Sequence, residues 1–212
     1  MSFSSTFSFE TRIYPLTDIR LSGLSHAEQV ARLTEAGAGL IQLREKQLSP
    51  CEFYHQAAQA LGVARKRGAR IVINDRVDIA LALGADGVHL GQYDLPPEAA
   101  RFLLGDRAII GFSTHNVDQA LRGATLPVNY LAIGPIFPTS SKTNAEPEVG
   151  LEGLRKLRRA MGHIPLLAIG GISLENVDQV LEAGADAVAV ITAALKDLNV
   201  LINRAKAPLA PF

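Results

Sequence analysis

The segment EAGADAVAV (Glu182–Val190) repeats, with small changes, two earlier stretches of the chain: EAGAGLIQL (Glu35–Leu43) and ALGADGVHL (Ala82–Leu90). Each stretch consists of a helix end, a glycine and a short apolar run. The shared glycines are separated by 47 and 100 residues, at Gly37, Gly84 and Gly184. These gaps are close to two and four multiples of a period of roughly 24–25 residues, a length that holds one strand and one helix. The repeat therefore predicts about eight such units along the chain.

Short apolar runs alternate along the whole chain with stretches of 3.6-residue period, which predicts parallel strands connected by helices. The expected strands are Ile13–Thr17, Leu40–Leu43, Arg70–Asn74, Gly87–Leu90, Ala108–Phe112, Tyr130–Gly134, Leu166–Gly170 and Ala187–Ile191. The expected helices include His26–Ala36, Glu52–Lys66, Leu151–Met161 and Leu174–Ala183. We therefore expect an α/β fold, a single-domain (β/α)8 TIM barrel over residues 1–212, with flexible ends at 1–11 and 206–212.

Composition excludes several functional classes. The 212 residues hold 21 Lys and Arg against 21 Asp and Glu, so no charge excess predicts binding to nucleic acid or to an anionic membrane. One cysteine excludes a disulfide framework. No apolar run approaches the roughly 20 residues of a membrane-spanning helix, and the first residues lack the pattern of a signal peptide. We expect a cytoplasmic protein whose oligomeric state is left open, a homo-oligomer included.

From the second expected strand onward, the loops that follow the carboxyl ends gather polar residues and glycines, and this is where the fold builds its active sites. The segments are Gln42–Lys46, Asn74–Arg76, His89–Asp94, Ser113–His115, Gly134–Lys142, Gly170–Gly171 and Ile191–Thr192. An inert barrel would not need polar residues gathered at one mouth. The last two segments occupy the usual phosphate site of the fold, although the glycines could serve only to permit a tight turn.

Charged residues of both signs belong to these segments. Asp75 and Asp94 follow adjacent strands and could converge on one Mg²⁺, although each could instead cap a helix. Arg44, Lys46 and Lys142 supply the positive charge that a diphosphate group requires. His115 is either a base or a hydrogen-bonded wall residue, whereas His89, inside a strand, is expected to be structural.

Six motifs occur in order, each at a strand end: QLREK, NDR, GADGVHLGQYD, GFSTH, GPIFPTSSK and AIGGI. With them, the chain resembles the thiamine-phosphate synthase family from Ile13 to Ala194. Members join a hydroxymethylpyrimidine diphosphate to a thiazole phosphate, giving thiamine phosphate and pyrophosphate. The resemblance therefore implies a transferase with two phosphorylated small-molecule substrates and Mg²⁺, in which diphosphate leaves before the new bond forms.

The resemblance also implies roles for individual residues. The pyrimidine diphosphate would contact Gln42, Leu43, Arg44, Glu45, Lys46, Asn74, Ser113 and Lys142, of which Lys46, Ser113 and Lys142 are the implied catalytic residues. The thiazole phosphate would contact Thr139, Ser140, Ser141, Gly171, Ile191 and Thr192. Mg²⁺ would be held by Asp75 and Asp94. Ser140–Glu148 is the expected lid.

Two other functions remain open. A thiazole tautomerase of the same superfamily would keep the barrel and use a histidine for proton transfer, a role open to His115. A non-catalytic barrel would bind a phosphorylated ligand without turnover. The tautomerase has no need of a diphosphate-binding set, so the combination of Lys46, Asn74, Asp75, Asp94 and Lys142 favours the synthase. The intact set for two substrates argues against a barrel that only binds a ligand.

Overall fold

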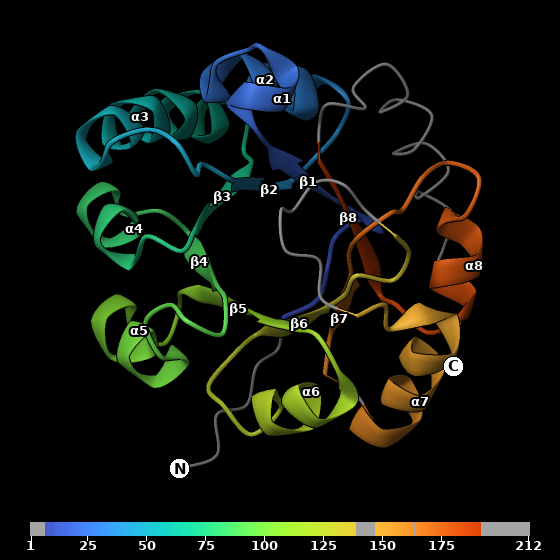
Figure 1. Cartoon of the computed structure of the whole chain (residues 1–212). Helices are drawn as coiled ribbons and strands as arrows, with labels where there is room; N and C mark the ends of the chain where they lie inside the picture. Colours follow the sequence, from blue (N-terminus) through green and yellow to red (C-terminus); the bar gives the residue numbers. More distant parts are fainter. Residues whose placement is uncertain (1–6, 139–146, 163, 192–212) are drawn as a thin grey trace.

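Eight parallel strands close into a barrel that is ringed by helices (Figure 1). The structure is a computed structural model, and it describes residues 7–138, 147–162 and 164–191. Each strand pairs with the next, and β8 pairs with β1, which confirms the predicted (β/α)8 barrel. The strands are β1 Ile13–Thr17, β2 Leu40–Leu43, β3 Arg70–Asn74, β4 Gly87–Leu90, β5 Ile109–Thr114, β6 Tyr130–Ile133, β7 Leu166–Ala168 and β8 Ala187–Ile191.

Helices connect the strands on the outside of the barrel. They are α1 Ile19–Ser22, α2 His26–Glu35, α3 Pro50–Lys66, α4 Val77–Leu83, α5 Pro97–Leu104, α6 Val117–Gly123, α7 Gly150–Met161 and α8 Val177–Glu182. The expected helix start at Leu174 is wrong. The Asn176 side chain accepts the Ser173 N–H at 2.8 Å, which folds that segment into a turn before α8 begins. Within the described part of the chain, no helix combines the length and hydropathy that a bilayer-spanning segment needs.

Local signals fix the ends of several elements. Ser25 and Ser49 begin α2 and α3, and each forms a capping box with the glutamate three residues later. The repeated glycines, Gly37, Gly84 and Gly184, have φ of 96°, 58° and 109°. L-residues with side chains rarely adopt these angles, so the repeat marks the turn that ends a helix and starts the next strand.

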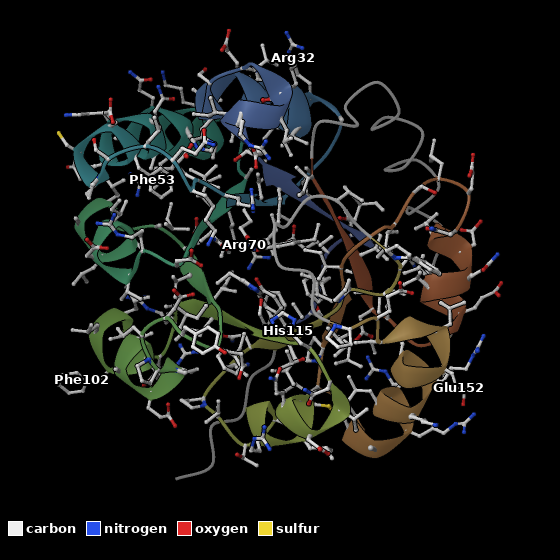
Figure 2. All side chains as sticks on the ribbon, in the orientation of Figure 1. Arg32, Phe53, Arg70, Phe102, His115 and Glu152 are labelled. Carbon is white, nitrogen blue, oxygen red and sulfur yellow. The ribbon has the colours of Figure 1, made fainter. Side chains whose placement is uncertain are left out.

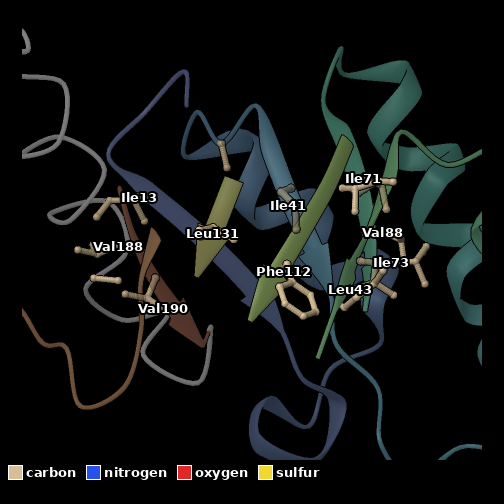
Figure 3. Packing of buried hydrophobic residues seen from close by; sticks show 14 of the residues in the cluster. Ile13, Ile41, Leu43, Ile71, Ile73, Val88, Phe112, Leu131, Val188 and Val190 are labelled. Atoms are coloured by element: carbon tan, nitrogen blue, oxygen red, sulfur yellow. The ribbon is translucent and has the colours of Figure 1, made fainter. Parts of the chain in front are cut away.

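Alternate residues of each strand face two different parts of the core. One set faces the helices and includes Ile41, Ile73 and Val88, which lie in the layer between strands and helices (Figure 3). The other set fills the barrel interior and includes Tyr14 and Val72. Because side chains along a strand alternate between its two faces, this parity decides which residues reach the mouth of the barrel.

Two phenylalanines of the amino-terminal segment pack on the interior set. Phe7 stacks on Tyr130 with ring centroids 5.6 Å apart. Phe9 lies 5.3 Å from Tyr130 and 5.9 Å from Tyr14. Since Tyr130 begins β6, this aromatic cluster lies at the end of the barrel opposite the strand carboxyl ends. The flexibility expected for 1–11 and 206–212 stays a prediction, because residues 1–6 and 206–212 lie outside the described part.

Replacing Phe9 by alanine should lower the free energy of unfolding by about 1–2 kcal/mol, because it removes a half-buried ring and its contacts with two tyrosines. Chemical denaturation would measure the change. Phe102→Ala is the matched control. Phe102 is 87% exposed and projects outward from α5 at the rim of the molecule (Figure 2), so its loss should change stability by less than about 0.5 kcal/mol. Equal losses for both variants would contradict the packing role of Phe9.

Candidate active site

A pocket opens among the strands and the loops that follow them, and its two sides differ in character. Polar side chains on the side of β2 to β5 are Gln42, Arg44, Lys46, Asn74, Asp75, His89, Gln92, Asp94, Ser113 and His115. Apolar side chains on the side of β6 to β8 are Ala132, Leu167, Ile169 and Ala189. The pocket can therefore hold a charged group against one wall and an apolar ring against the other.

Asp75 and Asp94 lie together in this pocket. Burial raises the pKa of Asp75 above its usual value, Lys46 opposes that rise, and the neighbouring Asp94 carboxylate adds to it. The Lys46 ammonium forms an ion pair with the Asp75 carboxylate. Neither aspartate acts as the expected helix cap, because the caps of α4 and α5 are Arg76 and Pro96. Two adjacent carboxylates remain available to a cation.

The donor set fits Mg²⁺. Among the described residues, no group of three or more His, Cys, Asp or Glu side chains could hold a metal ion. Mg²⁺ does not require such a group, because it usually takes one or two carboxylates and completes its shell with phosphate oxygens and water. The mutual repulsion of Asp75 and Asp94 is relieved by a cation between them.

Asp75 also has an unusual backbone. Its φ is 63°, and it is the one residue other than glycine with positive φ in the described part of the chain. Its N–H donates to the carbonyl of His89 in the adjacent strand at 2.8 Å. This bond between β3 and β4 fixes the loop at the strand end, so a strained conformation is maintained at a pocket residue.

Arg44 is held at the mouth by Asp18, which follows β1. The guanidinium forms an ion pair with the Asp18 carboxylate. The other carboxylate oxygen of Asp18 accepts the Leu21 N–H at 3.0 Å and caps α1. Arg44 is therefore oriented before any substrate binds.

Asn74 and Gln42 are buried polar residues in the pocket, 7% and 2% exposed. The Asn74 Nδ2 atom is buried and has no hydrogen-bond partner among the described residues. A buried donor without a partner is destabilising, so its presence in a pocket indicates a ligand acceptor.

Ser113 lies in the same wall and contacts two neighbours. Its hydroxyl is 2.8 Å from Nε2 of His89, and its carbonyl accepts the Gln92 amide at 2.5 Å. The sequence analysis placed the segment His89–Asp94 at the mouth of the barrel but gave neither His89 nor Gln92 a role in the site. The alternation in Gly87–Leu90 could have indicated it, because His89 shares the inward parity of Gly87 and pairs in register with Asn74.

His115 lies at the pocket wall, and Figure 2 shows it inside the circle of helices that surrounds the barrel. Its Nδ1 is 2.8 Å from the carbonyl oxygen of Gly134. A carbonyl can only accept, so Nδ1 carries the proton and Nε2 is free of it when the ring is neutral. The position is consistent with both of the roles that the sequence left open.

Some predicted residues do not point into the pocket. The Leu43 side chain is fully buried between the strands and the helices. The Glu45 carboxylate accepts the N–H groups of Gln47 and Leu48, which shapes the loop after β2. Gly171 and Ile191 are not among the residues that line the pocket. Thr139, Ser140, Ser141, Lys142, Thr192 and most of the expected lid, Ser140–Glu148, lie outside the described residues.

The glycine pair after β7 has a steric role. Gly170 and Gly171 have φ of 99° and 65°. A Cβ at Gly170 would lie 2.7 Å from the Pro135 Cα, and one at Gly171 would lie 2.6 Å from the Pro138 carbonyl oxygen. Only glycine therefore lets the loop after β6 pack against this turn, and phosphate binding there stays a prediction.

Comparison with known proteins identifies the family. A family profile described as thiamine monophosphate synthase matches residues 13–194. The chain belongs to the thiamine monophosphate synthase family. A thiamine-phosphate synthase of Albidiferax ferrireducens is 47% identical over 183 residues, covering 86% of this chain and 83% of the relative. One from Chloroflexus aurantiacus is 42% identical over 202 residues, covering 91% and 93%.

A solved member of the same family has the same fold. The thiamine phosphate pyrophosphorylase of Pyrococcus furiosus superposes with a TM-score of 0.78 at 37% identity and covers 89% of this chain and 90% of that one. The thiamine monophosphate synthase family is the one that the six sequence motifs predicted, and that prediction is confirmed.

Proposed function

We propose that this protein is a thiamine-phosphate synthase, which joins hydroxymethylpyrimidine diphosphate to thiazole phosphate and releases pyrophosphate. The observation that carries the proposal is the pocket wall in which Arg44 and Lys46 lie beside the paired carboxylates of Asp75 and Asp94. Relatives of that name at 42–47% identity support the same reaction. A cytoplasmic location and a homo-oligomeric state stay predictions.

The polar wall would bind the pyrimidine diphosphate. Gln42, Arg44, Lys46, Asn74 and Ser113 all present hydrogen-bond donors to one space, and Lys142 would join them. Asn74 supports this role most directly, because its Nδ2 has no hydrogen-bond partner among the described residues. Leu43 and Glu45 would contribute through their backbone groups, because their side chains serve the core and the loop.

Asp75 and Asp94 would hold Mg²⁺. The ion supplies positive charge that stabilises a diphosphate leaving group. Lys46, paired with Asp75 at the same place, would add a second positive charge and keep the carboxylate oriented.

The rest of the reaction needs positioning more than proton transfer. When the C–O bond to diphosphate breaks, negative charge grows on the leaving group, where Arg44 and Lys46 stabilise it. The pyrimidine methylene cation left behind is stabilised by its electron-rich ring. The apolar wall of Leu167, Ile169 and Ala189 excludes water that would otherwise capture this cation. The thiazole nitrogen, placed by its phosphate near Thr139–Ser141, Gly171, Ile191 and Thr192, then forms the C–N bond.

Incubation of the purified protein with both phosphorylated substrates should give thiamine phosphate and pyrophosphate in equal amounts. Removal of Mg²⁺ by a chelator should lower the rate by on the order of 10²-fold or more, and added Mg²⁺ should restore it. Chromatography of both products would measure the reaction. Binding of the substrates without turnover would contradict the proposal and favour a barrel that only binds a phosphorylated ligand.

The tautomerase is the second candidate, because His115 lies in the pocket with an unprotonated Nε2 in its neutral form. Isomerisation of the thiazole phosphate alone, without a new C–N bond, would favour it. His115→Asn would then abolish the activity, whereas a synthase should keep most of its turnover in this variant.

A further inference from the structure

A chain of buried hydrogen bonds runs through the barrel interior and ends at Ser113. The hydroxyl oxygens of Tyr14 and Tyr130 are 3.0 Å apart, and the Tyr130 hydroxyl lies 2.9 Å from Nδ1 of His89. Nε2 of the same histidine lies 2.8 Å from the Ser113 hydroxyl. At the other end, the Gln42 amide donates to the Tyr14 hydroxyl at 3.4 Å. The chain thus connects residues of β1, β2, β4, β5 and β6.

We propose that His89 is a positioning residue that directs the Ser113 hydroxyl proton into the pocket. The proposal rests on the proposed function, in which Ser113 donates to the diphosphate of the pyrimidine substrate. His89 lines the pocket, but both of its ring nitrogens are engaged, by Tyr130 and by Ser113. It acts by donating a hydrogen bond to Ser113, which leaves the serine proton for the substrate anion.

The Gln42 amide determines the direction of the chain. An amide nitrogen only donates, so the Tyr14 oxygen accepts from Gln42 and its own proton goes to Tyr130. Tyr130 then donates to Nδ1 of His89, which must be unprotonated. A neutral imidazole of this kind carries its proton on Nε2, and that proton points to Ser113.

The opposite direction leaves a buried group unsatisfied. If Ser113 donated to His89, then Tyr130 would donate to Tyr14, which would already accept from Gln42. The Tyr14 proton would then have no acceptor among the described residues. Tyr14 and Tyr130 are 1% and 0% exposed, so water does not replace the missing partner.

The phenols of Tyr14 and Tyr130 keep their protons near neutral pH, as the chain of hydrogen bonds requires. Burial raises the pKa of Tyr14 to about 12 and raises the pKa of Tyr130 well above its usual value. Phe7 and Phe9 cover these two tyrosines from the end of the barrel opposite the strand carboxyl ends. The two tyrosines are therefore enclosed, and the hydrogen-bond chain reaches the pocket at Gln42, His89 and Ser113. Gln42 and Ser113 are the two members that the substrate would contact.

Two substitutions of His89 distinguish the proposal from a merely structural role, because they differ in whether the hydrogen bond to Ser113 can form. Asparagine at position 89 can reach Tyr130 but not Ser113, whereas glutamine can reach the position of Nε2 and donate to Ser113. His89→Asn should lower kcat by about 10- to 100-fold, and His89→Gln should recover most of that loss. His55→Asn, an exposed change on α3, is the matched control and should leave kcat unchanged.

A double-mutant cycle with Ser113→Ala provides the decisive comparison. Because His89 acts through Ser113, His89→Asn should cost less than about twofold once the hydroxyl is gone. An equal fold loss in both backgrounds, with unchanged thermal midpoints, would overturn the proposal and leave His89 as a packing residue. Absence of product with the unmodified protein would instead contradict the proposed function.

A measurement without substrates tests the proton positions directly. Long-range ¹H–¹⁵N correlation spectra of the protein labelled with ¹⁵N at histidine distinguish the two neutral forms, and the signals missing in His89→Asn identify this residue. We expect the form protonated at Nε2. A proton at Nδ1, or on both nitrogens, at neutral pH would overturn the assigned direction whatever the activity of the protein.

Discussion

Asp75→Asn should lower kcat by on the order of 10²- to 10³-fold and raise the Mg²⁺ concentration that gives half-maximal rate. The substitution removes a negative charge from the carboxylate pair and from the ion pair with Lys46. Mg²⁺ and Lys46 would therefore both lose the charge that holds them at the leaving group. Asparagine is chosen because it tolerates the φ of 63° at this position, whereas alanine would strain it. The Mg²⁺ dependence of product formation would measure both effects.

Asp78→Asn is the control for this prediction. Asp78 lies on the same loop-to-helix segment, but its carboxylate forms an exposed ion pair with Arg76, with Nε and Oδ1 2.8 Å apart. Its loss should leave kcat and the Mg²⁺ requirement unchanged. If Asp75→Asn behaved like Asp78→Asn, then Asp75 would belong neither to a metal site nor to the diphosphate site.

Gly111→Ala should lower the free energy of unfolding by about 1–3 kcal/mol. Gly111 is buried in β5, where its absent side chain makes room for the ring of Tyr130. A Cβ would lie 2.5 Å from Nδ1 of His89 and closer still to the tyrosine. Tyr130 cannot move away, because it is fully buried under the phenylalanines. Denaturant titration would measure the loss of stability.

Gly62→Ala adds the same methyl group in a different environment. Gly62 is inside α3, and a Cβ there would meet nothing within 4 Å. Alanine should therefore stabilise the protein by about 0.5–1 kcal/mol, because glycine costs more backbone entropy in a helix. Equal stability of Gly111→Ala and the unmodified protein would show that β5 and β6 can separate without cost. Gly111→Ala should also lower kcat if it displaces His89 from Ser113.

The elements of the barrel follow from local rules that a sequence displays. Gly37, Gly84 and Gly184 mark helix ends because each requires a φ that other residues avoid. Ser25 and Ser49 begin helices through bonds that span three residues. The bounds of β1 to β4 and β8 agree with the prediction, because an apolar run between such signals has few alternatives. The helix expected from Leu174 begins three residues later, at Val177, because a bond from the Ser173 N–H to the Asn176 side chain forms a turn there.

The side of each strand on which a residue lies was harder to predict. Gln42 and Leu43 are neighbours in one motif, yet the first lines the pocket and the second packs under the helices. A contiguous motif identifies a strand end but not the parity of its side chains, which depends on how the barrel closes. The same uncertainty assigned His89 a structural role and missed its contact with Ser113.

The sequence by itself determined the fold, the family and the loops that carry the polar residues, because these depend on spacing along the chain and on conformations that only certain residues adopt. The tertiary structure alone decided which of those residues meet. Asp75 lies beside Asp94, Asn74 has a buried donor with no partner among the described residues, and a line of hydrogen bonds joins Gln42 to Ser113. Each of these contacts depends on the register between strands that are distant in sequence, and closure of the barrel sets that register.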